Sequence, residues 1–115
     1  MSDRASVQFG DAVIAASGTL SGAVNVDGAL AVNIDIPTCD DAAVITFLQS
    51  SHEAGTYYNI YDELGVEVSI PSGTHNKNYA TPYLVGHRWI KIRSGSAGDT
   101  TAQTSAVTLV VKGTR

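Results

Sequence analysis

Charged side chains are scarce in this chain. They make up 16% of the 115 residues, whereas soluble domains usually carry about 25%. Seven Lys and Arg residues against eleven Asp and Glu residues leave a formal net charge of −4. Nucleic-acid binding depends on a basic surface that neutralises phosphates, and the few basic residues are scattered apart from Arg88, Lys91 and Arg93. We therefore expect no nucleic-acid partner.

Cysteine occurs once, at Cys39. A single thiol cannot close an intramolecular disulfide, which excludes the class of small secreted domains that disulfides hold together. Asp40 and Asp41 follow the thiol, and neighbouring carboxylates disfavour the reactive thiolate. We interpret Cys39 as a small, semi-buried loop residue and not as a nucleophile.

Long apolar runs are missing as well. A membrane-spanning helix needs about 20 apolar residues, and the opening MSDRASVQFGDA lacks the core of a signal peptide. We therefore expect no membrane association. We also expect that the protein is made in a cytoplasm without export. Residues 1–9 show little patterning and are expected to form a flexible arm that orders on a partner. Residues 10–115 are the right length for a single domain.

Apolar residues at helical spacing are also absent, and alternation with a period of two replaces them. The alternation is clearest in ALAVNIDI, where one face carries Leu30, Val32, Ile34 and Ile36. Other alternating or apolar segments lie at 11–17, 22–26, 43–51, 55–62, 66–70, 88–94 and 106–112. About eight short strands with turn signals between them predict an all-β, two-sheet β-sandwich or a barrel.

Several local structures follow from the turn residues. Segment 55–70 is predicted to form a hairpin with its turn at Glu63-Leu64-Gly65. In this hairpin the side chains of Val66, Val68 and Ile70 are expected to face the core. One turn of helix is expected near 82–85, with Thr81 as its cap, Pro82 in its first position and Gly86 at its end. The small polar residues of 95–105 predict a flexible loop.

Residues that carry out chemistry are few and dispersed. His52, His75 and His87 fall in three separate predicted loops, so they do not form the convergent ligand set that zinc requires. Paired carboxylates such as Glu53 and Glu63 could flank a sugar, as glycan hydrolases require, but both lie in predicted turns, where exposed acids are ordinary. We expect no metal, no cofactor and no enzymatic activity.

Aromatic residues point instead to binding. On segment 88–94, Trp89 shares a face with Lys91 and Arg93, opposite Ile90 and Ile92. Trp, Tyr and Arg dominate interface hot spots, so we predict that this outward face contacts a protein partner. The alternative is that Trp89 packs under a loop while the two cations are simply solvated. Further predicted contact residues are Tyr57, Tyr61, Arg4 and Phe9.

Apolar residues also occupy both faces of several strands, as in the pairs Val13-Ile14, Val44-Ile45, Phe47-Leu48 and Val110-Val111. The outer face of an isolated sandwich should be polar. The excess therefore predicts self-association or docking on a larger assembly.

Three stretches resemble small virion proteins of tailed bacteriophages: SGTLSGAVNVDGALAVNIDIP, ITFLQSSHEAGTYYNIYDELGVEVSI and YLVGHRWIKIRSGSAG. The stretches lie at 17–37, 45–70 and 83–98, and the resemblance as a whole spans roughly residues 17–112. The chain departs from the commonest pattern at 51–55, where an Asp-Gly-Gly-like turn is more usual, and in a longer polar loop at 72–78.

The resemblance implies a jelly-roll capsid decoration, or cement, protein. Such a protein would bind the major capsid protein on the outside of the virion as a homo-oligomer, a dimer or a trimer, after synthesis in the host cytoplasm. An alternative is a tail or baseplate module that binds host-surface carbohydrate, with Tyr57, Tyr61 and Trp89 as stacking platforms.

Overall fold

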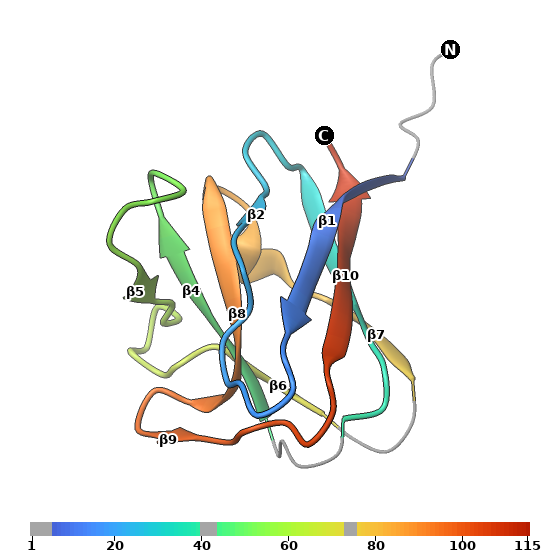
Figure 1. Cartoon of the computed structure of the whole chain (residues 1–115). Coiled ribbons are helices and arrows are strands. Elements are labelled where there is room, and N and C mark those ends of the chain that lie inside the picture. Colours follow the sequence, from blue (N-terminus) through green and yellow to red (C-terminus); the bar gives the residue numbers. More distant parts are fainter. Residues whose placement is uncertain (1–5, 40–43, 73–75) are drawn as a thin grey trace.

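The computed structural model describes residues 6–39, 44–72 and 76–115. Their strands form two antiparallel sheets, shown in Figure 1. The four-stranded sheet has the order β1 (Val7–Ile14), β10 (Val107–Thr114), β3 (Ala31–Ile36), β7 (Lys77–Ala80). The six-stranded sheet has the order β2 (Val24–Asn25), β8 (Trp89–Ser96), β4 (Val44–Ser50), β5 (Tyr58–Asn59), with β6 (Ser69–Pro71) also on β4 and β9 (Asp99–Thr100) on β8. The predicted all-β sandwich is confirmed.

The strand order is that of a jelly-roll. Strands β5 and β6 both run antiparallel to β4 and pair with successive parts of it, so they act as one interrupted strand. When β5 and β6 are counted as one strand and the short β9 is set aside, eight strands remain. Their orders are first–eighth–third–sixth in one sheet and second–seventh–fourth–fifth in the other, so the chain changes sheet after every strand except the fourth. Two Greek keys wound in this way make the eight-stranded jelly-roll.

The core lies between the sheets and takes the faces that alternation predicted. Its largest fully buried side chains include Ile34, Ile36, Phe47, Ile90, Ile92 and Leu109. Leu30 was expected on the same face as Ile34, but 55% of it is exposed. The reason is that β3 begins only at Ala31, so Leu30 still belongs to the bend that follows the Asp27-Gly28 turn.

The predicted hairpin over 55–70 has its turn where it was expected, but the observed arms are shorter than the predicted ones. Asp62 holds the turn, because its Oδ1 accepts the backbone N–H groups of Leu64 at 2.8 Å and Val66 at 2.9 Å. Gly65 follows with φ +80°. The arms separate outside 60–68, since β5 and β6 pair with β4 and not with each other. Val66 was expected inward but is 59% exposed, because the 60–68 hairpin is an excursion from the sheet.

The expected helical turn is present as the 3-10 helix η1 (Pro82–Leu84), with Pro82 in its first turn and Gly86 beyond it at φ +95°. Thr81 occupies the N-cap position, as expected, but its side chain makes no capping hydrogen bond. The Thr81 hydroxyl donates to the carbonyl of Val32 at 2.9 Å, which ties η1 to β3 instead of capping the helix.

Segment 95–105 was expected to be a flexible loop but contains regular structure. Gly95 and Ser96 pair with the residues of β9. Gln103 is buried, and its Nε2 donates to Ser94 Oγ at 2.9 Å. A run of small polar residues gives no indication that one of its side chains is buried and hydrogen-bonded in this way.

The expected boundary of the N-terminal arm also changes. Val7 and Gln8 already pair with Gly113 and Lys112 of β10, and Phe9 packs against the core at a register shift. Residues 7–9 therefore belong to the sandwich. Residues 1–5, including Arg4, lie outside the described residues.

Candidate interaction face

The predicted contact residues of β8 lie on the outer surface of the six-stranded sheet. Ile90 and Ile92 are fully buried between the sheets, which confirms that Trp89, Lys91 and Arg93 point the other way. The register with β4 sets these three side chains beside Ser50, Leu48 and Thr46 respectively. We call this surface the β8 face. Its residues differ in how exposed they are and in how many contacts they already make within the chain.

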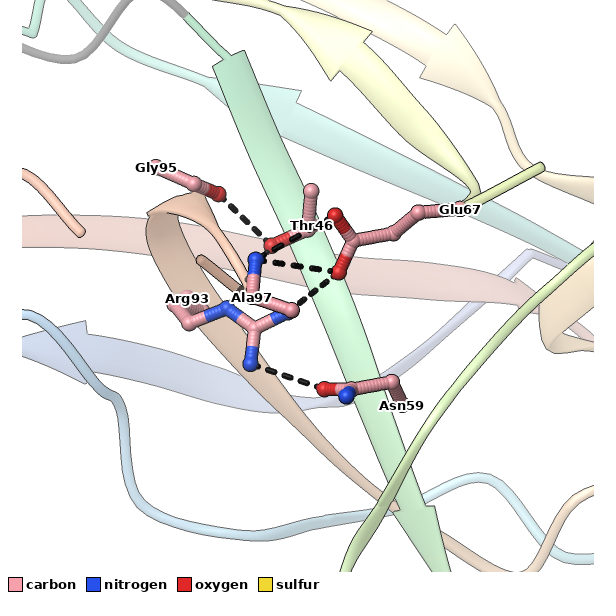
Figure 2. A network of polar contacts seen from close by, with 6 residues as sticks. All are labelled: Thr46, Asn59, Glu67, Arg93, Gly95 and Ala97. Carbon is pink, nitrogen blue, oxygen red and sulfur yellow. Dashed lines mark hydrogen bonds and ion pairs between the residues drawn. The ribbon is translucent and has the colours of Figure 1, made fainter. Parts of the chain in front are cut away.

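Arg93 lies in a network of polar contacts, which Figure 2 shows. Its Nη2 donates to Glu67 Oε2 at 2.5 Å and its Nη1 to Asn59 Oδ1 at 2.8 Å. Its Nε donates to Thr46 Oγ1 at 3.0 Å. Each guanidinium nitrogen is thus bonded within the chain, and only 8% of Arg93 is exposed.

Glu67 extends the network to the β8–β9 turn. The backbone N–H of Ala97 lies 3.2 Å from both Glu67 carboxylate oxygens. The hydroxyl of Thr46 donates to the carbonyl of Gly95 at 2.6 Å. The expectation of an exposed interfacial arginine is therefore corrected: Arg93 is an internal anchor that fastens the 60–68 hairpin onto the sheet.

Lys91 and Tyr57 form a pair beside this network. The Lys91 ammonium sits 4.4 Å from the centroid of the Tyr57 ring, within the range of a cation–π interaction. The Tyr57 hydroxyl donates to the backbone carbonyl of Glu53 at 2.8 Å. Burial raises the pKa of Tyr57, and the Glu53 charge raises it further. One ring face of Tyr57 is occupied, so a sugar cannot stack there while Lys91 stays in place.

Trp89 and Tyr61 lie at different places on the β8 face. Trp89 is half-buried and pairs with Asn25 of β2 and Ser50 of β4. Tyr61 is 51% exposed on the hairpin, where it pairs with Glu67. The structure thus groups Trp89 with Lys91 and Tyr57, while Tyr61 stands beside the arginine network.

Phe9 belongs to the other sheet. It is half-buried, and the Arg115 guanidinium lies 4.6 Å from its ring centroid. Phe9 comes from the start of β1 in the four-stranded sheet, whereas Trp89 lies on β8 in the six-stranded sheet.

Sequence patterns missed an exposed apolar surface at the hairpin tip. Leu64 is 83% exposed, and Tyr83 and Val85 are 41% and 37% exposed. The Tyr83 hydroxyl donates to Glu63 Oε2 at 2.9 Å, and this hydrogen bond raises the pKa of Tyr83. The contact joins residues 20 positions apart, so periodicity within one strand carries no signal for it.

The described ranges hold no group of three or more His, Cys, Asp or Glu side chains that could bind a metal ion. The same ranges contain no helix with the length and apolar character needed to cross a membrane. No family model matches the chain, and no significant match exists among curated proteins or solved structures.

Proposed function

We propose that this protein is a capsid decoration protein of a tailed phage, which binds the major capsid protein on the outside of the head. The observation that carries the proposal is the β8 face, where Trp89 and Lys91 lie beside the hydrogen-bonded Arg93 network. Aromatic residues such as Trp are among the usual anchors of protein interfaces, and Lys91 adds a positive charge on the same face of β8. The phage assignment itself rests on the resemblance of the three quoted sequence stretches.

The mechanism would be stapling of neighbouring capsid subunits by a homo-oligomer. Packaged DNA strains the contacts between subunits, and a bound protein that bridges two of them adds its binding free energy to that contact. Repetition around a closed shell makes weak individual contacts strong through multivalency. No chemical step is needed, so the proposed role is binding and not catalysis.

The test is co-sedimentation of the purified protein with DNA-filled heads that lack it, prepared from the phage that encodes it. Wild-type protein should saturate the heads in a ratio set by the shell symmetry. Trp89→Ala and Lys91→Ala should each weaken binding at least about tenfold, the effect of losing roughly 1.4 kcal/mol.

Lys112→Ala is the matched control, because Lys112 is an equally accessible cation on the four-stranded sheet, paired with Asp35. It should bind as the wild type does. No binding of the wild-type protein to heads would refute the decoration role. Normal binding by folded Trp89→Ala and Lys91→Ala would refute the assignment of the β8 face.

A further inference from the structure

A hollow lies beside the loop that joins β4 to β5, which is the green loop at the upper left of Figure 1. Its volume is about 340 Å³, and its lining includes Gln49, Ser51, His52, Thr56 and Tyr58. That volume is near the lower end of the roughly 300–1,000 Å³ typical of small-molecule sites. We call it the loop hollow.

The lining of the loop hollow is polar and lacks carboxylate, ammonium and guanidinium groups. The Gln49 side chain is half-buried, and its amide forms no hydrogen bond with any residue that the structure describes. An amide without a protein partner offers two donors and an acceptor to a ligand. Tyr58 adds an aromatic ring that is 63% exposed.

The loop beside the hollow is held in place before any ligand arrives. Ser50 Oγ accepts the backbone N–H of His52 at 3.2 Å, and the N–H of Gly55 donates to the His52 carbonyl at 3.0 Å. On the other side, the Tyr57 hydroxyl donates to Glu53, and Lys91 covers the Tyr57 ring. A site that is already ordered loses little conformational entropy on binding.

We propose that the loop hollow binds a neutral sugar ring. A pyranose has an apolar C–H face that can pack on the Tyr58 ring, and a rim of hydroxyls that can exchange hydrogen bonds with the Gln49 amide and the Ser51 hydroxyl. The absence of lysine and arginine from the lining disfavours anionic ligands. This site goes beyond the proposed decoration role, and its residues differ from the β8 face residues Trp89 and Lys91.

The test is an NMR titration of the ¹⁵N-labelled protein with glucose, galactose, mannose and N-acetylglucosamine, each added alone. At least one sugar should shift the side-chain amide signals of Gln49 and the backbone signals of 51–56 in a saturable manner. Tyr58→Ala and Gln49→Leu should each weaken that sugar at least about fivefold. Tyr61→Ala removes another exposed tyrosine, outside the hollow, and should leave the affinity unchanged.

The proposal would be overturned if none of the four sugars caused a saturable shift. It would also be overturned if the folded Tyr58→Ala and Gln49→Leu variants bound the sugar with wild-type affinity, or if glycerol at the same concentration caused the same shifts as the sugar. Head binding by Tyr58→Ala should equal that of the wild type, so the sugar site and the decoration role can fail independently.

Discussion

Arg93 shows how far the alternation of a strand determines the environment of one residue. Period-two patterning placed its side chain on the outer surface of β8, and that direction is correct. It does not make the side chain solvent-exposed, because Asn59 of β5 and Glu67 of the 60–68 hairpin cover it. The covering residues lie 26 and 34 positions away in the chain, and only the complete topology brings them close.

The ion pair of Arg93 and Glu67 should contribute strongly to stability. Their side chains are only 10% and 18% exposed, and removing one partner from such a pair leaves the other charge desolvated and uncompensated. We expect Glu67→Gln to lower the free energy of unfolding by about 2 kcal/mol or more, measured by urea denaturation.

Asp35→Asn is the control, because the Asp35–Lys112 pair is 39% and 38% exposed. Screening by solvent limits such pairs to less than about 1 kcal/mol. If the two variants lost equal stability, the arginine network would be no more than a surface contact.

His87 should make the protein sensitive to mild acid. Burial lowers the pKa of His87, although a backbone hydrogen bond with Tyr83 opposes this in part. Between that lowered pKa and about 6.5, the unfolded chain binds more protons than the folded chain. The free energy of unfolding should therefore fall as the pH drops below about 6.5, and His87→Asn should flatten this decline.

The direct measurement is titration of the His87 ring by NMR, and a midpoint above about 6.5 would contradict the prediction. Asp35 does not interfere in this range. A hydrogen bond from Lys112, and then one from Asn78, lower the pKa of Asp35 from its ordinary 3.8, so its contribution is lost only in stronger acid.

At the scale of the element, the strands with clean alternation were predictable, whereas the extent of the short ones was not, since the expected segments 22–26 and 55–62 contain only the two-residue strands β2 and β5. Val32, Ile34 and Ile36 bury one face of β3, because both edges of this strand are paired and its inner face alone meets the core. Strands β5 and β9 have two residues each, too few for any period to show. Their positions are decided by pairing with β4 and β8.

The β8–β9 turn should depend on Gly95 and tolerate change at Gly98. Gly95 has φ +97°, and a Cβ there would lie 2.4 Å from the carbonyl oxygen of Asp99. Backbone strain together with such a clash should cost Gly95→Ala about 1–3 kcal/mol of unfolding free energy.

Gly98→Ala is the matched control from the same turn, because a Cβ there meets nothing within 4 Å. Its stability should stay within about 0.5 kcal/mol of the wild type. Thermal and urea unfolding of both variants would check the pair, and an unaffected Gly95→Ala would show that the turn adjusts without loss.

At the scale of the whole molecule, the fold class was predictable from the sequence and the candidate site only in part. Alternation and turn residues are local, and they account for the sandwich and for the outward direction of Trp89 and Lys91. The arginine network, the loop hollow and the contact of Tyr83 with Glu63 join segments from different structural elements. These depend on which strands become neighbours, and strand order leaves little trace in one sequence.

Because β1 begins at Val7, two truncations of different length can separate the contribution of the N-terminal arm from that of the sandwich. Deletion of 2–9 would remove Val7 and Gln8 from their pairs on β10, together with the packing of Phe9 under Arg115. Because a half-buried aromatic and the end of a strand are lost, we expect this deletion to cost about 2 kcal/mol or more of unfolding free energy.

Deletion of 2–5 keeps β1 whole, and its effect on unfolding should stay within about 0.5 kcal/mol. It is therefore the variant that tests whether the arm binds the capsid shell, since reduced head binding by the 2–9 deletion would mix lost contacts with lost stability. We expect the 2–5 deletion to weaken co-sedimentation with heads while the urea midpoint stays unchanged. Full head binding by this variant would remove Arg4 from the interface, and the shell contact would then fall to Trp89 and Lys91.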